Sequence, residues 1–118
     1  MADDLPAPTL AARQLALRAI MDGRGVEAVI LCSPQGLGHY GGVAGGLLVV
    51  TAREARHVQP DAPGGPWAHA AALLPPGCDL GFEEDAADHE ALALVRRLAR
   101  PRRMLPLSAD LARQIAEQ

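Results

Sequence analysis

The apolar residues near the start of the chain recur at helical spacing. Leu10, Leu17 and Met21 share one side of a predicted helix. Thr9 can cap this helix at its start, and the glycines that follow Met21 end it, one of them in the left-handed conformation. Residues 1–9 are expected to be a flexible lead-in.

The segments that follow have the composition of β-strands. Residues 26–32 and 47–51 are apolar with almost no alternating polarity, as expected of strands that are covered on both faces. A turn at residues 53–54 is predicted to lead into a weaker third strand over residues 55–59. Residues 60–66 are rich in Pro and Gly, so they are predicted to form neither a helix nor a central strand.

The second half of the chain continues the alternation of helices and strands. Pro106 cannot donate a hydrogen bond to a neighbouring strand, so its strand is predicted to lie at an edge of the sheet. The whole pattern predicts an α/β fold: a single layered domain over residues 10–118, with a mixed sheet of about five short strands flanked by helices. The predicted elements of this half are a helix over 67–74, a strand over 79–82, a helix that starts at Asp85 or Asp88, a strand over 104–107, and a helix from its cap Ser108 through Ile115.

Residues 32–43 are predicted to form a glycine-rich bend between two strands. Glycine allows positive φ angles and close approach to a ligand, and α/β sheets usually bind ligands just after a parallel strand. The glycines at 36, 38 and 41 have the spacing of a dinucleotide-binding fingerprint, but a strand follows them where that fingerprint requires a helix. Dinucleotide binding is therefore not expected. Two interpretations stay open: a ligand or partner loop, or a simple bend of the chain.

Four residues of this bend are the candidate ligand-binding residues. His39 is also the candidate catalytic residue, because an imidazole can act as an acid or a base near neutral pH. The phenol of Tyr40 can orient a substrate. No acidic residue that could orient His39 is adjacent in sequence, so packing with a surface hydrogen bond is the alternative for both aromatic residues. The four candidates are Gln35, His39, Tyr40 and Gly42.

The composition limits the compartment and the kinds of partner. Hydrophobic residues make up 49% of the 118 residues, but no apolar run approaches the roughly 20 residues that span a bilayer. The acidic start of the chain is unlike a targeting peptide, so a cytoplasmic protein without a membrane partner is expected. The net charge of −3 disfavours nucleic-acid binding, which needs a concentrated basic face.

Several kinds of chemistry are excluded or disfavoured by the residues themselves. The chain has no Lys, and all 11 of its basic residues are Arg. Schiff-base chemistry and lysine-dependent phosphate loops are therefore excluded. Cys32 and Cys78 are not in a CxxC motif, and the four His residues lack metal-ligand spacing, so neither a metal nor another cofactor is expected. The two cysteines are interpreted as reduced structural thiols, and a reactive thiol at Cys32, which ends a predicted strand beside the glycine-rich bend, is the alternative.

An acidic run over residues 83–85 is followed by an arginine cluster over residues 96–103. Acidic residues at the start of a helix and basic residues at its end both suit the helix dipole, which explains the two clusters without a ligand. Arg102 and Arg103 lie beyond Pro101 and can still contact an anionic partner.

Five short motifs follow one another in a characteristic order. They are Arg13-x-x-x-Leu17-Arg18-x-x-Met21, Gly25-x-Glu27-Ala28, Ser33-Pro34 with Gly42, Leu80-Gly81-Phe82-Glu83, and Ser108-Ala109-Asp110-Leu111. In this order they resemble the N-terminal domain of the creatinase, prolidase and aminopeptidase P family, over about residues 10–117. The chain departs from the family pattern at Gly36, which replaces Asn, at His39, which stands where Tyr is expected, and over the polar segment 55–66.

The resemblance implies a mixed sheet flanked by helices and a role in dimer formation, with the Ser33-Pro34 loop near the substrate pocket of the partner subunit. In that family the two-metal site belongs to a separate downstream domain, which we expect to be missing here. The resemblance therefore implies a stand-alone binding or assembly domain, homodimeric and without peptidase activity of its own. Two alternatives stay open: a small metal-free pathway enzyme that uses residues 32–43 on a small-molecule ligand, or a subunit that completes a separate catalytic domain.

Overall fold

The structure is a computed structural model that describes residues 7–117. Helix α1 (Ala7–Arg24) begins inside the segment predicted as a lead-in, whose first six residues lie outside the described residues. Thr9 lies inside α1 and does not cap it, because Pro8 is compatible with the first turn of a helix and allows an earlier start. Gly25 follows the helix with a φ of +70°, which confirms the predicted left-handed glycine.

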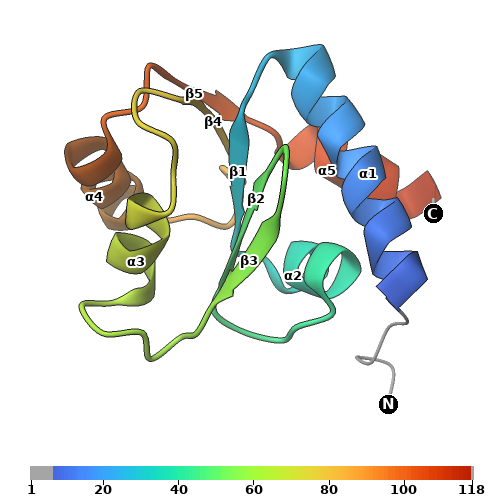
Figure 1. Cartoon of the computed structure of the whole chain (residues 1–118), viewed down its shortest axis with the longest axis horizontal. Helices are drawn as coiled ribbons and strands as arrows, with labels where there is room; N and C mark the ends of the chain where they lie inside the picture. Colours follow the sequence, from blue (N-terminus) through green and yellow to red (C-terminus); the bar gives the residue numbers. More distant parts are fainter. Residues whose placement is uncertain (1–6, 118) are drawn as a thin grey trace.

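Five strands form one mixed sheet in the order β3-β2-β1-β4-β5 (Figure 1). β1, β4 and β5 are parallel, whereas β2 is antiparallel to both of its neighbours. Pro106 lies in β5 at the edge of the sheet, as its missing N–H predicts. These features confirm the predicted α/β fold. The strands are β1 (Ala28–Leu31), β2 (Leu47–Thr51), β3 (Ala55–Val58), β4 (Asp79–Phe82) and β5 (Arg103–Pro106).

Helices cover both faces of the sheet, so the fold has three layers (Figure 1). One face carries α1, α2 and α5, and the other carries α3 and α4. Alternate residues of β1 divide the core: Val29 and Leu31 pack toward α1, α2 and α5, while Ala28 and Ile30 pack toward α3 and α4. β1 is buried on both faces, as its sequence predicts. The remaining helices are α2 (Pro34–Gly41), α3 (Pro66–Ala72), α4 (His89–Ala99) and α5 (Ser108–Glu117).

The predicted bend over residues 32–43 is wrong, because most of that segment forms helix α2. Ser33 caps the helix, since its side-chain oxygen accepts a hydrogen bond from the N–H of Gly36 at 2.9 Å. The glycine that follows α2 ends it with a φ of +64°. Leu37 and Tyr40 are buried one turn apart, and their burial offsets the roughly 1 kcal/mol that each glycine costs inside a helix.

The starts of α4 and α5 are held by acidic side chains. Of the two predicted starts, Asp85 and Asp88, it is Asp88 that caps α4, because its carboxylate accepts a hydrogen bond from the N–H of Ala91 at 2.8 Å. Ser108 does not cap α5 as predicted: its hydroxyl oxygen accepts a bond from the N–H of Asp85 at 3.2 Å. The N–H of Ser108 donates instead to the carboxylate of Glu84 at 2.9 Å. This cap comes from another segment of the chain, so local sequence does not reveal it.

α1 is the longest helix of the described residues, with 18 residues. Within residues 7–117, no helix combines the length and the hydropathy that crossing a membrane requires.

Candidate functional site

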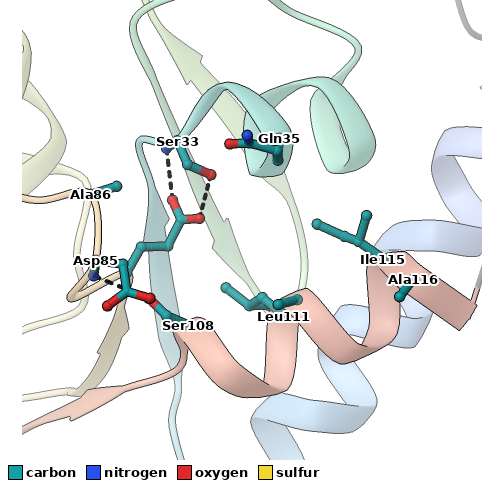
Figure 2. A pocket seen from close by; sticks show the side chains of 10 residues that line it. Ser33, Gln35, Asp85, Ala86, Ser108, Leu111, Ile115 and Ala116 are labelled. Atoms are coloured by element: carbon teal, nitrogen blue, oxygen red, sulfur yellow. Dashed lines mark hydrogen bonds between the residues drawn. The ribbon is translucent and has the colours of Figure 1, made fainter.

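A cavity of about 410 Å³ opens at the edge of the sheet where the parallel strands β1, β4 and β5 end (Figure 2). At this edge α/β sheets usually bind ligands. We call it the carboxyl-edge cavity. One face of α5 supplies most of its apolar wall. Its polar lining consists of Ser33, Gln35, Glu83, Asp85 and Ser108.

Glu83 follows β4 directly and holds the connection between β1 and α2. It is buried, with only 6% of the residue exposed. Its Oε1 accepts hydrogen bonds from the N–H of Cys32 at 2.6 Å and the N–H of Ser33 at 2.9 Å. Its Oε2 accepts a third bond from the hydroxyl of Ser33 at 2.5 Å. Three donors compensate the cost of burying this charge. The sequence offered Glu83 only as part of an acidic run and of a family-like motif, so its structural role was missed.

Gly36 lies against this network. Its N–H donates to the oxygen of Ser33, whose own proton goes to Glu83. A methyl group on Gly36 would lie 2.9 Å from Oε2 of Glu83, closer than side-chain carbons normally approach. Glycine is therefore required here by the close packing of a carboxylate, not by an unusual φ angle.

Both cysteines are free, and their surroundings suppress the thiolate form. Burial, followed by the negative charge of Glu83, raises the pKa of Cys32 to about 12. Burial also raises the pKa of Cys78. Thiolates are the reactive form of cysteine, so neither thiol is activated by this structure. This agrees with the interpretation of the two cysteines as structural.

Only one of the four candidate ligand-binding residues lies at the cavity. Gln35, at the start of α2, is exposed and lines it. His39 is half-buried near the end of α2 and is not among the residues that line it. The rings of His39 and Tyr40 meet edge to face, with centroids 4.6 Å apart. Gly42 ends α2. The catalytic role of His39 and the ligand-binding role of the four residues stay predictions.

Tyr40 is completely buried and links three helices. Its hydroxyl donates to the side-chain oxygen of Gln114 in α5 at 2.5 Å, and the amide of Gln114 donates to the carbonyl of Ala16 in α1 at 2.9 Å. The side-chain amide of Gln14 donates to the carbonyl of Tyr40 at 2.8 Å. The spacing of Leu37 and Tyr40 on one side of a helix is the sequence signal that could have revealed this packing.

At the other end of β4, a buried acid pairs with two arginines. Asp79 accepts bonds from Arg102, through Nε at 3.0 Å and also through Nη2, and from Nε of Arg103 at 3.2 Å. The bonds from Arg102 and then Arg103 lower the pKa of Asp79 to about 2. The anionic group that these two arginines contact thus belongs to their own chain. No local sequence pattern indicates Asp79 as their partner.

Within residues 7–117, no group of three or more His, Cys, Asp or Glu side chains is placed to hold a metal ion.

Solved structures show which known domains are similar to this one, while no family model and no curated protein matches the sequence. The creatinase/prolidase N-terminal domain of an X-Pro dipeptidase from Streptococcus pyogenes has a TM-score of 0.72 at 15% identity, over 86% of this chain and 97% of that one. The Xaa-Pro dipeptidase from Bacillus anthracis has a TM-score of 0.76 at 13% identity, over 89% of this chain and 35% of that one. The prolidase from Pyrococcus horikoshii OT3 has a TM-score of 0.69 at 15% identity, over 83% of this chain and 33% of that one.

These similarities confirm at the level of the fold the resemblance that the five sequence motifs indicate. At 13–15% identity they show the fold alone. The chain spans about a third of the length of the Bacillus and Pyrococcus proteins, 35% and 33%.

Proposed function

We propose that this chain is a binding and assembly domain that works as a homodimer and has no peptidase activity of its own. One observation carries the proposed lack of peptidase activity: two groups that could take part in chemistry, the carboxylate of Glu83 and the hydroxyl of Tyr40, hold the fold together. Glu83 accepts three hydrogen bonds from the β1–α2 connection. The hydroxyl of Tyr40 donates to Gln114. Glu83 and Tyr40 are therefore used to hold helices and strands in place, which suits a domain that presents a binding surface.

The proposed partner is a second copy of the chain, bound at the opposite edge of the sheet. A groove of about 660 Å³ lies there between α1, the β2–β3 turn and the residues that follow α3. Leu15 stands beside it on α1 with 69% of its surface exposed, and Leu73 and Leu74 line it. We call this surface the Leu15 face. Burial of one leucine side chain contributes about 1.5–3 kcal/mol, and a two-fold dimer buries Leu15 twice.

The charges on the Leu15 face fit a second copy. In a two-fold dimer the same patch meets itself, so each basic residue must find an acidic residue on that patch. The groove is lined by both signs of charge: Arg18 and Arg53 are basic, while Asp22 and Glu54 are acidic. A face of this kind is complementary to itself. The resemblance to the creatinase and prolidase N-terminal domains implies a role in dimer formation, which also supports a second copy of the chain as the partner.

The test is the molar mass in solution, measured by light scattering after size-exclusion chromatography across micromolar concentrations. We expect a mass of twice 12.3 kDa for the unaltered chain and a monomer for Leu15→Arg. Leu98→Arg is the matched control, because Leu98 is 52% exposed but lies on α4, outside the Leu15 face, so this variant stays dimeric. A strict monomer of the unaltered chain, or a dimer of Leu15→Arg, contradicts the proposal.

The proposed lack of peptidase activity has its own test. The purified chain is incubated with an Xaa-Pro dipeptide and Mn²⁺, and the release of proline is measured. We expect release no faster than in buffer with Mn²⁺ alone. Release above that level contradicts the proposal, and release that appears only with a co-purifying metallopeptidase supports the alternative of a subunit that completes a separate catalytic domain.

A further inference from the structure

We infer that the carboxyl-edge cavity binds a small organic amine: a ligand with one primary ammonium group on a compact, branched apolar body. The inference does not rest on the proposed dimer, because the cavity and the Leu15 face lie at opposite edges of the sheet. It combines the size of the cavity, the division of its lining into a polar end and an apolar wall, and the sign of its charge.

The size and the apolar wall fit a small hydrocarbon group. The volume of about 410 Å³ falls in the range of roughly 300–1,000 Å³ that is typical of small-molecule sites. Figure 2 shows Leu111 and Ile115 on the side of α5 that faces Ser33 and Gln35 at the start of α2. Leu111 and Ile115 are four residues apart, so they form one face of the helix, together with the two alanines that follow them.

The polar end offers hydrogen-bond acceptors that the fold does not use. Within residues 7–117, no hydrogen-bond donor and no cation contacts the carboxylate of Asp85. The one hydrogen bond of Asp85 in this region is made by its backbone N–H, which donates to the hydroxyl oxygen of Ser108. Oε2 of Glu83 accepts one bond, from Ser33, although a carboxylate oxygen can accept about two. A primary ammonium group has three donors and no acceptor, which suits this set of oxygens.

The charge of the lining selects a cation. Among the described residues that line the cavity, none is Arg or His, so the charges of Glu83 and Asp85 are not neutralised by a basic neighbour there. Attraction between charges is stronger near low-dielectric protein walls than in bulk water. An anion of the same shape is repelled, and a neutral alcohol forms only the weaker uncharged hydrogen bonds.

Two residues of the polar end, Glu83 and Ser108, are held in place before any ligand arrives, whereas the side chain of Asp85 is exposed. Glu83 is fixed by the N–H groups of Cys32 and Ser33 and by the hydroxyl of Ser33. The position of Ser108, which lines the same end, is fixed by its bond to the carboxylate of Glu84. Binding therefore has to order Asp85 but not Glu83 or Ser108, which limits its entropic cost.

The test uses three probes with the same body and different head groups: isoamylamine, isoamyl alcohol and isocaproate. Amide chemical shifts are followed by NMR at neutral pH on the full chain. We expect isoamylamine to shift residues 83–86 and 111–116 with a dissociation constant on the order of 1 mM, about ten-fold tighter than the alcohol, and isocaproate not to bind. Ca²⁺ alone at the same concentration is expected to leave these resonances unchanged.

Two matched variants locate the ammonium group. Asp85→Asn keeps the shape and the N–H bond to Ser108 but removes the charge, so isoamylamine is expected to bind about ten-fold more weakly. Asp61→Asn makes the same chemical change at an exposed residue that does not line the cavity, and is expected to leave the affinity unchanged. Leu15→Arg is expected to bind the amine with the same affinity as the unaltered chain. The test of the cavity therefore does not depend on whether the chain forms a dimer.

The inference is overturned if the alcohol or isocaproate binds as tightly as the amine, if the shifts lie outside the cavity, or if Ca²⁺ displaces the amine. Unchanged affinity in Asp85→Asn also overturns it, provided that the dispersed spectrum of the free variant shows that it is folded.

Discussion

Gly36 and Glu83 lie so close together that a methyl group on the glycine would be 2.9 Å from Oε2 of the carboxylate. The same methyl group would be 3.0 Å from the hydroxyl oxygen of Ser33. The carboxylate cannot move away without lengthening its bonds to the backbone of Cys32 and Ser33. A glycine that in the sequence indicates flexibility therefore marks dense packing around a buried charge.

Gly36→Ala is expected to lower the free energy of unfolding by about 1–3 kcal/mol, because the clash with Glu83 outweighs the gain of roughly 1 kcal/mol from better helix propensity. Gly38→Ala is the control in the same helix, since a methyl group there meets nothing within 4 Å. This variant is expected to gain about 0.5–1 kcal/mol. Urea denaturation measures both values, and changes of the same sign would contradict the packing argument.

Tyr40 is the only tyrosine of the chain, so the absorbance of phenolate reports on it alone. Burial, followed by the charge of Glu83, raises its pKa from 10.0 to about 12. The unfolded chain, with a tyrosine pKa of about 10, then loses its proton first, and stability falls as the pH rises from about 10 to about 12. A titration midpoint near pH 10 in the folded protein would contradict this burial.

Tyr40→Phe removes both the titrating phenol and its hydrogen bond to Gln114, and the two effects on stability appear at different pH. At neutral pH the variant is expected to lose roughly 1 kcal/mol of stability, because the side-chain oxygen of Gln114 loses its donor. Between about pH 10 and pH 12 its stability is expected to change less than that of the unaltered chain, as no phenol titrates. Urea denaturation at a series of pH values provides the comparison.

The ion pairs of Asp79 are expected to make the fold less stable in acid. Arg102 and Arg103 lower its pKa to about 2, below the value of about 3.9 in an unfolded chain. The stabilisation is therefore complete above about pH 4 and is lost as the pH falls toward about 2. Asp79→Asn is expected to flatten the stability profile in this window, whereas Asp61→Asn, at an exposed residue, keeps the profile of the unaltered chain. Identical profiles for the two variants would refute the assignment.

Arg100 is the one non-glycine residue with a positive φ angle, +48°, among residues 7–117, and it follows the last residue of α4. Left-handed backbone favours glycine at this position, so Arg100→Gly is expected to raise stability by up to about 1 kcal/mol. Arg97→Gly removes the same charge from inside α4 and is expected to cost about 1 kcal/mol. Thermal unfolding distinguishes the two, and a loss in both variants would contradict the backbone argument.

Local pattern was sufficient for most of the fold. The predicted limits of β2 (47–51) and β4 (79–82) match the structure, because each is a short segment bounded by turn residues. The edge position of β5 follows from Pro106 alone. α2 was missed because its glycines outweighed two correct signals: the Ser33-Pro34 start and the one-turn spacing of Leu37 and Tyr40.

The candidate site was harder to predict because its contacts join distant segments. Glu83 bonds to Cys32 across 51 positions, and Arg102 bonds to Asp79 across 23. Neither pair has a periodic signature, since tertiary hydrogen bonds depend on where whole elements pack. Of the four candidate ligand-binding residues, Gln35 alone lines the cavity, and its ligand-binding role stays a prediction.

The packing of α5 against α1 has a consequence for biosynthesis. Arg24 pairs with Asp110, and Gln114 joins Ala16 to the hydroxyl of Tyr40. A ribosome synthesises α1 first and α5 last. The hydrophobic cluster that both helices cover therefore stays partly exposed until nearly the entire domain has been translated. The layer formed by α3 and α4 is complete once α4 ends at Ala99, so that side of the nascent sheet can be covered 18 residues (117 − 99) before the end of α5.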